Sequence, residues 1–209
     1  MIDVIPLPLG PLQANCYLLI HEETRKAIIV DPGDDADLVI QTVTQNHAEP
    51  IMIINTHGHG DHIGANRQIK EHYNIPLAIH SGDAHMLTNA EANLSTLLGW
   101  AITSPPADII LEDGDIQDLS GTAIRVLKTS GHSPGGISLY FDGKVLTGDA
   151  LFRMSIGRTD IPGTSYNDLI HGIKENLLTL PDETLVYPGH GPTTTIGDEK
   201  RNNPFLQGL

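Results

Sequence analysis

Short apolar runs, many of them rich in β-branched residues, recur along the chain between clusters of glycine, proline and polar residues. Such runs are too short for helices and are typical of strands that are buried in a sheet. The predicted strands cover 2–7, 16–20, 26–30, 51–54, 77–80, 109–111, 116–119, 123–128, 138–141, 144–146 and 184–187. Asp142-Gly143 separates two of these runs and predicts a tight hairpin there.

Helices are predicted where apolar residues share one face over a longer stretch. The first begins after Asp34 or Asp35, either of which can cap it, and extends to about Asn46. Further helices are predicted over 62–73, 84–98 and 166–178. Strands and helices follow one another in each of two halves, and this order indicates a layered α/β domain rather than a simple strand–helix alternation.

Length and charge narrow the range of partners. The 209 residues suffice for one domain with a substantial core. The chain has 12 Lys and Arg against 26 Asp and Glu, a net charge of −14. This excess of acidic groups argues against a nucleic acid or an anionic membrane as partner. An anionic substrate would need local cations, bound metal included.

The number of cysteines and the hydropathy of the chain indicate the cellular compartment in which we expect the protein. Cys16 is the only cysteine, so no intramolecular disulfide can form, and its strand-like surroundings predict a buried side chain. No apolar stretch is long enough to span a bilayer, and residues 1–10 lack the pattern of a secretory signal. We therefore expect a cytoplasmic protein. Trp100, the only tryptophan, is expected in the core, with the lining of a cleft as the less favoured alternative.

The hexapeptide HGHGDH at 57–62 is the most informative stretch, because it directly follows a predicted buried strand. Such strand ends are where α/β folds place ligands. His57 and His59 alternate with glycine and can point the same way, whereas Asp61 and His62 come one turn later and aim at a neighbouring point. Imidazole and carboxylate together suit zinc, and also iron or manganese. The hexapeptide offers four ligand-type side chains, which is more than one tetrahedral zinc takes from a single loop. The spacing therefore predicts two metals.

Three later segments share one form: a short apolar strand, then a ligand-type residue beside glycine. They lead to His132, Asp149 and His190. The combined set of seven candidate ligands is His57, His59, Asp61, His62, His132, Asp149 and His190. Seven ligands suit two metals that share one bridging carboxylate.

The chain resembles the metallo-β-lactamase superfamily in these motifs. They read THGHGDH at 56–62, TSGHSPG at 129–135, TGD at 147–149 and YPGHGP at 187–192. Within the superfamily the chain is similar to the glyoxalase II (hydroxyacylglutathione hydrolase) branch, in its short bacterial forms. The resemblance covers essentially the whole chain. It implies a four-layer αβ/βα sandwich with the metals at one edge, formed by a single domain over 1–209 without an additional C-terminal helical domain.

The resemblance also implies how the ligands divide between two divalent ions, zinc above all, with iron or manganese as alternatives. His57, His59 and His132 would hold the first metal. Asp61, His62 and His190 would hold the second, and Asp149 would bridge the two. True β-lactamases of the superfamily place a cysteine where Asp149 stands, so the aspartate favours the glyoxalase-type centre.

The reaction implied is hydrolysis of a small-molecule thioester such as S-lactoylglutathione. A hydroxide stabilised between two metals would attack the carbonyl, and the metals would stabilise the oxyanion. Asp61 is the catalytic candidate, since it could orient the attacking oxygen. By resemblance Arg158 would bind the glutathione part, with Arg153 as a weaker candidate. Asp160 stands where an aromatic partner is expected, and this leaves glutathione specificity open.

Other functions remain open at this point. One is an iron-dependent persulfide dioxygenase, whose family shares the histidine motif. Another is a lactone or phosphodiester hydrolase of the same superfamily, and a third is a non-catalytic metal-binding module. The oligomeric state and the role of 81–106 also stay open, since part of this segment could be a lid or a packed helix.

Overall fold

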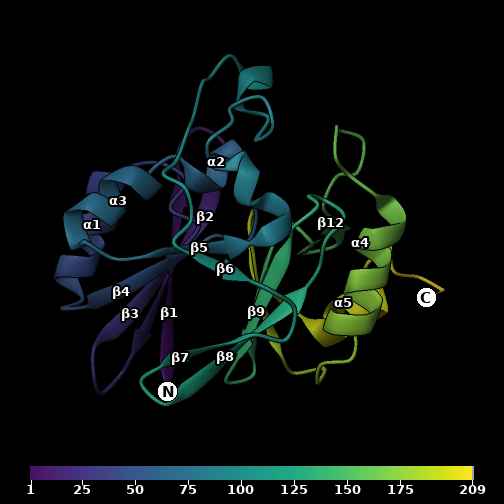
Figure 1. The fold of residues 1–209 in the computed structure, drawn as a ribbon. Helices are drawn as coiled ribbons and strands as arrows, with labels where there is room; N and C mark the ends of the chain where they lie inside the picture. Colours follow the sequence, from purple (N-terminus) through teal and green to yellow (C-terminus); the bar gives the residue numbers. More distant parts are fainter. Residues whose placement is uncertain (209) are drawn as a thin grey trace.

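Two six-stranded sheets pack face to face in the computed structural model, which describes residues 1–208 (Figure 1). The strand β2 (Ala14–His21) is buried along its whole length, so both of its faces are covered. Cys16 and Leu18 pack with the helices on one side, whereas Tyr17 and Leu19 lie between the sheets. The alternation of side chains along a strand thus serves two separate apolar layers.

The first sheet has the strand order β1-β2-β3-β4-β5-β6. Its other strands are β1 (Ile2–Leu9), β3 (Lys26–Val30), β4 (Glu49–Ile54), β5 (Leu77–His80) and β6 (Ile109–Leu111). The strands β1 to β3 pair antiparallel, whereas β3 to β6 pair parallel. The parallel strands end at one edge of the sheet, so the loops that follow them gather there.

The second sheet has the order β14-β13-β10-β9-β8-β7. Its strands are β7 (Ile116–Leu119), β8 (Thr122–Lys128), β9 (Ile137–Phe141), β10 (Lys144–Gly148), β13 (Leu185–Pro188) and β14 (Thr194–Thr195), and β11 (Leu151–Phe152) and β12 (Ser155–Ile156) form a separate hairpin. The predicted hairpin between β9 and β10 is confirmed. Asp142 and Gly143 have φ values of 45° and 69°, as a tight two-residue turn requires.

Helices cover the outer face of each sheet and complete four layers. The first sheet carries α1 (Ala36–Gln45) and α3 (Asn66–Tyr73). The second carries α4 (Tyr166–Gly172), its π-helical continuation η3 (Ile173–Leu177) and α5 (Ile196–Asn202). The predicted αβ/βα sandwich is therefore confirmed. No helix within residues 1–208 is both long and apolar enough to cross a membrane.

The predicted helix over 84–98 is wrong. This segment contains the 3-10 helix η1 (Ser81–Met86), a series of turns and the 3-10 helix η2 (Ser95–Leu98). Asparagine side chains compete with the helix for backbone groups. Asn89 Oδ1, for example, accepts hydrogen bonds from two backbone N–H groups just after it.

Two further predictions need correction. The helix over 62–73 is divided into α2 (Gly60–Ile63) and α3, because the Ala65 N–H donates to the carbonyl of Pro32 rather than to a carbonyl within the helix. The strand over 184–187 is not the last, since β14 and α5 follow it. A strand as short as β14 leaves no apolar run from which it could be predicted.

Candidate metal centre

Four strands deliver the predicted ligands to one edge of the sandwich. The hexapeptide at 57–62 follows β4, and its second half forms α2. His132 comes after β8, Asp149 directly after β10, and His190 after β13. The structure therefore brings all seven side chains together, although they are distributed over most of the chain.

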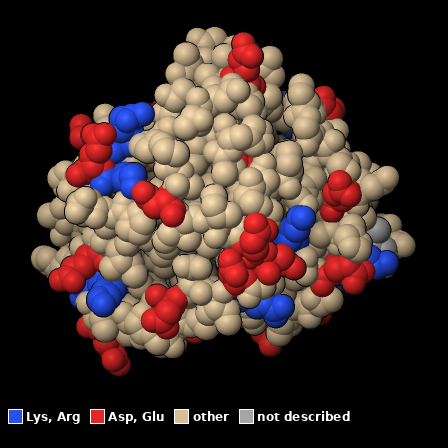
Figure 2. Space-filling view, viewed as in Figure 1, with Lys and Arg blue, Asp and Glu red and all other residues tan. Residues whose placement is uncertain are grey.

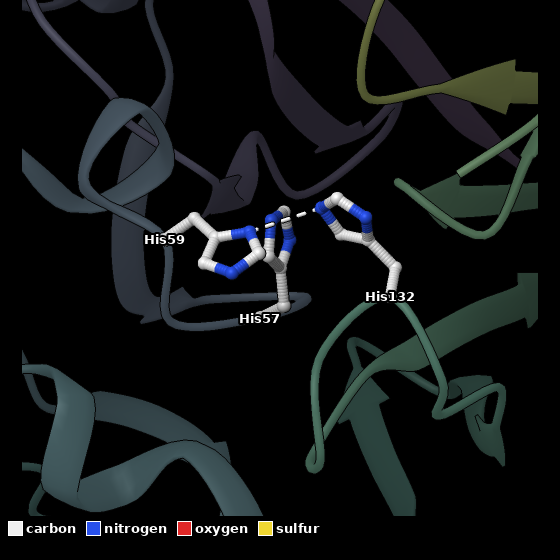
Figure 3. A group of neighbouring side chains, drawn as sticks. All are labelled: His57, His59 and His132. Atoms are coloured by element: carbon white, nitrogen blue, oxygen red, sulfur yellow. Dashed lines mark hydrogen bonds between the residues drawn. The ribbon is translucent and has the colours of Figure 1, made fainter. Parts of the chain in front are cut away.

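His57, His59 and His132 form a first trio, in which one ring nitrogen from each lies within 4.8 Å of the others. His59 Nδ1 is 2.9 Å from His132 Nε2, and Figure 3 shows these two rings turned toward one another beside His57. His57 Nε2 is buried and has no hydrogen-bond partner. An unpaired buried nitrogen is costly, and a metal among the three rings would satisfy it.

Asp61, His62 and His190 form a second trio with the same spread of 4.8 Å between ligand atoms. His62 Nε2 lies 3.3 Å from His190 Nε2. Asp61 Oδ2 lies 3.3 Å from His190 Nε2 and 3.7 Å from His62 Nε2. One carboxylate and two imidazoles thus face a common point beside the first trio.

Asp149 lies between the trios. Its Oδ2 is 3.4 Å from His132 Nε2 and 3.5 Å from His190 Nε2. Its Oδ1 is buried without a hydrogen-bond partner. Gly189 permits this approach, because a Cβ at that position would lie 2.1 Å from Asp149 Oδ1. One carboxylate group therefore faces both trios, as the resemblance implies.

Four of the histidines are held from outside the centre through Nδ1. The partner atoms are Thr56 Oγ1 for His57 (3.2 Å), Asp31 Oδ2 for His62 (3.1 Å), the Arg158 carbonyl for His132 (3.0 Å) and the Leu12 carbonyl for His190 (3.2 Å). Such outer bonds fix the tautomer and direct Nε2 toward a metal. The donor set and its unpaired buried atoms therefore fit two divalent metals.

A family model described as the metallo-beta-lactamase superfamily matches residues 9–190, a span that contains every candidate ligand. The chain belongs to this superfamily. The predicted membership is thereby confirmed.

Two curated relatives of the superfamily match nearly the whole chain. Probable metallo-hydrolase YqgX of Bacillus subtilis (strain 168) is 40% identical over 207 residues, with 97% of each chain covered. Hydroxyacylglutathione hydrolase GloC of Haemophilus influenzae is 36% identical over 208 residues, with 96% of each chain covered.

Two crystal structures have closely similar folds. BLEG-1 B3 metallo-beta-lactamase has a TM-score of 0.95 at 39% identity and covers 99% of this chain and 100% of its own. TTHA1623 in a di-iron-bound form has a TM-score of 0.86 at 39% identity, with 97% of this chain and 100% of that chain covered. The metal in a relative of this superfamily is thus not always zinc.

Asp31 supports both trios of this superfamily centre, although the sequence analysis did not single it out. Its Oδ2 accepts hydrogen bonds from Thr56 Oγ1 (2.5 Å) and His62 Nδ1 (3.1 Å), and Oδ1 accepts from the Thr56 N–H (2.7 Å). Thr56 Oγ1 then faces His57 Nδ1. One carboxylate orients His62 directly and His57 through Thr56. The available signal was its place at the end of β3.

Asp83 is a second residue that the sequence analysis missed. It is fully buried in η1, and its two oxygens accept hydrogen bonds from the N–H groups of Gly58 (2.9 Å) and Gly135 (2.6 Å). Gly58 separates His57 from His59, and Gly135 belongs to the loop of His132. Asp83 therefore joins the two loops of the first trio. No short-range pattern indicated this role.

The two trios differ in protonation in the metal-free protein. Burial and then the neighbouring His132 lower the pKa of His59 to about 3, and burial also lowers the pKa of His57. Burial opposes charge on His62 as well, but Asp61 and Asp149 raise its pKa to about 10. His57 and His59 are thus neutral at neutral pH, whereas a metal at the second trio must displace the proton on His62.

We expect the metal-free protein to lose stability on acidification below pH 6.5. Between pH 6.5 and about 3 the unfolded chain binds a proton at His59 that the folded chain does not, so the free energy of unfolding falls as the pH falls. One such group contributes up to about 1.4 kcal/mol per pH unit. The raised pKa of His62 contributes stability that is fully present below pH 6.5 and is lost toward pH 10. Urea unfolding between pH 4.5 and 9 measures both slopes.

The variant His59→Gln is the control for this prediction, because glutamine does not titrate. Its acid slope should be shallower than that of the unsubstituted protein. An acid limb that is flat, or equal in the two proteins, would contradict the assigned cause.

A cleft of about 540 Å³ opens over the centre, and its lining includes His59, Asp61 and Asp149. Trp100 is a half-buried residue of this lining, so of its two predicted places the cleft is confirmed and the favoured one, the core, is wrong. Cys16 is buried as predicted, and burial raises the pKa of its thiol.

The two arginines predicted to bind substrate lie in different surroundings. Arg158 lines the cleft, and its guanidinium forms a two-point ion pair with Asp160 (2.7 and 3.0 Å). Arg153 is exposed in the turn between β11 and β12 and is not part of the cleft lining. Substrate binding by either arginine stays a prediction.

Proposed function

We propose that this chain is a metallo-hydrolase of the superfamily that cleaves small-molecule thioesters at a two-metal centre. The observation that carries the proposal is the position of Asp149, whose Oδ2 faces His132 and His190 at nearly equal distances. A bridging carboxylate between two ligand trios suits a pair of metals. The relative named hydroxyacylglutathione hydrolase supports a thioester as substrate.

Within residues 1–208, no cysteine or serine of the cleft is activated as a nucleophile, and Ser155 Oγ in the lining faces the carbonyl of Ile156. Cys16 is buried and its thiol pKa is raised. Within residues 1–208, no serine hydroxyl is hydrogen-bonded to a histidine ring, and Ser95 Oγ is engaged by the backbone of Ala90 and Ile102. When bound, two divalent metals supply a water of lowered pKa and polarise the carbonyl. Water is therefore the proposed nucleophile.

Asp61 is the proposed catalytic residue. Burial raises the pKa of its carboxyl, but His62 and His190 together lower it by more. The net pKa is below the usual value, so the group stays ionised at neutral pH. A carboxylate that lines the cleft can accept a hydrogen bond from the attacking water and hold it toward the carbonyl. The departing thiolate is a good leaving group and needs little help from a general acid.

We expect Asp61→Asn to lower kcat about a hundredfold at saturating zinc, because an amide orients water less well and accepts no proton. Steady-state hydrolysis and a metal count on the same sample measure the effect. Near-normal turnover with both metals bound would remove Asp61 from the mechanism. A loss of activity that follows a loss of metal would instead assign it to metal binding alone.

The substrate class is tested with a panel offered to the zinc-loaded protein. The panel contains S-D-lactoylglutathione, acyl thioesters of N-acetylcysteamine, a lactone, a phosphodiester and a chromogenic β-lactam. The proposal expects thioesters to be hydrolysed with the highest kcat/KM. The β-lactam is included because BLEG-1 B3 metallo-beta-lactamase shares the fold at 39% identity. Preference for any other class would overturn the proposal.

The active metal is identified by measuring hydrolysis of the same panel with protein loaded with different metals. Protein prepared with zinc, iron or manganese is compared, since the ligand chemistry accepts each and TTHA1623 has been crystallised in a di-iron-bound form. Oxygen consumption by the iron-loaded protein with a persulfide, without thioester hydrolysis, would favour the dioxygenase alternative.

A further inference from the structure

One wall of the cleft consists of apolar side chains that come from a single segment. Leu94, Leu97, Leu98 and Trp100 all line it. Leu97 and Leu98 are 67% and 51% exposed, so large apolar surface faces an open space. Apolar surface left uncovered at the mouth of a candidate active site marks a place for an apolar ligand.

The wall is almost free of charge. Between 84 and 107, Glu91 is the only Asp, Glu, Lys or Arg in the sequence. This segment forms the projection above α2 in Figure 1, and the same projection in Figure 2 is tan apart from one acidic patch. A substrate that lies against it is therefore not held by ion pairs.

Among the described residues that line the cleft, Arg158 is the only Lys or Arg. Asp160 already occupies its guanidinium with two hydrogen bonds of 2.7 and 3.0 Å. Asp61 and Asp149 add negative charge to the same cleft. A ligand with free carboxylates would lose hydration there without gaining an unpaired cation beyond the metals themselves.

Leu94, which lines the cleft, has a strained backbone. Leu94 has φ 64°, in the left-handed region that leucine rarely adopts. The buried side chain of Asn93 fixes the flanking chain, because its amide donates to the carbonyls of Met86 and Ile102. The Asn93 carbonyl also accepts from the Gly60 N–H (3.0 Å), next to His59. The apolar wall is thus attached to the metal-ligand loop.

From these observations we propose that the preferred substrates are uncharged thioesters with an apolar acyl chain, which lies against Leu94, Leu97, Leu98 and Trp100. The inference rests on the proposed thioester hydrolysis for its reaction, but on the cleft alone for its selectivity. A glutathione thioester, which carries two carboxylates, is the disfavoured ligand.

Binding is measured first, without turnover, through the fluorescence of the only tryptophan, Trp100. The probes are two thioethers that cannot be hydrolysed, S-hexyl-N-acetylcysteamine and S-hexylglutathione. We expect the uncharged thioether to bind about tenfold more tightly. Equal binding, or tighter binding of the glutathione thioether, would overturn the inference.

Two exposed aliphatic residues give a matched pair of variants. Leu97→Asn places an amide on the wall, and Ile116→Asn, at a residue 63% exposed on β7, places one outside the cleft lining. We expect Leu97→Asn to weaken binding of the uncharged thioether about fivefold, and Ile116→Asn to leave it within about twofold. Asparagine tolerates the left-handed backbone at position 94, so Leu94→Asn should weaken binding of the uncharged thioether to a similar extent as Leu97→Asn. Equal effects of the Leu97 and Ile116 variants would contradict the wall.

Hydrolysis is measured second, with N-acetylcysteamine thioesters from acetyl to hexanoyl. Each fully buried CH₂ is worth up to about fourfold in kcat/KM, so we expect a rise of at least about tenfold across the series. Hydrolysis that does not depend on chain length would keep the proposed function and overturn the inference. Selective binding of the uncharged thioether without hydrolysis of any thioester would do the reverse.

Discussion

Asp149→Asn should lower kcat/KM about a thousandfold, the upper range for loss of one electrostatic contact in an active site. The reason is geometric, since within residues 1–208 Asp149 is the one side chain whose oxygens face His132, His62 and His190. An amide has one acceptor oxygen and no charge, so it cannot serve two metals equally. We also expect the number of bound zinc ions to fall from about two per chain toward one.

The control for this prediction is Asp160→Asn, at an exposed carboxylate that pairs with Arg158. It changes the net charge by the same amount and should leave metal content unchanged. Activity is measured alongside metal content on dialysed protein. An Asp149→Asn variant that keeps two zinc ions and normal turnover would contradict the bridging position.

Asp31→Asn should weaken zinc binding about ten- to a hundredfold, as loss of an outer partner of a metal-ligating histidine does. Asparagine tolerates the left-handed backbone at this position, where φ is 51°. Its amide, however, would present a donor to His62 Nδ1 or Thr56 Oγ1, where Asp31 Oδ2 now accepts from both. The free energy of unfolding should also fall by about 2 kcal/mol, since hydrogen bonds to a buried charge are lost.

Zinc affinity is measured by competition with a chromogenic chelator, and stability by urea unfolding of the metal-free protein. Asp37→Asn, at an exposed position of α1, is the control and should change neither quantity. An Asp31→Asn variant with unchanged zinc affinity would show that Asp31 supports the fold alone.

The seven candidate ligands could be predicted because their signals are local. Each belongs to a glycine-containing loop that follows an apolar strand, as the loops of His132 and His190 show. Asp31 and Asp83 could not be found in this way. Their roles depend on hydrogen bonds to residues 25 or more positions away, such as Thr56 and Gly135. Only the assembled fold reveals such contacts.

The fold, too, has parts that local sequence signals predict and parts that they do not. The bounds of β3 and β5 were predicted from apolar runs, because burial on both faces leaves a continuous pattern. The segment over 84–98 also carries leucines and alanines, but its asparagines bond to the local backbone and break the helix. The leucines that remain exposed there face the cleft, so a pattern typical of helix packing belongs to a candidate binding surface.

The most direct test of the central proposal is a zinc titration of the metal-free protein, with thioester hydrolysis and bound zinc measured in the same sample. A two-metal centre held by both trios and Asp149 predicts that hydrolysis reaches its maximum at about two zinc ions per chain. Maximal hydrolysis at one zinc ion, or no thioester hydrolysis at two, would contradict it.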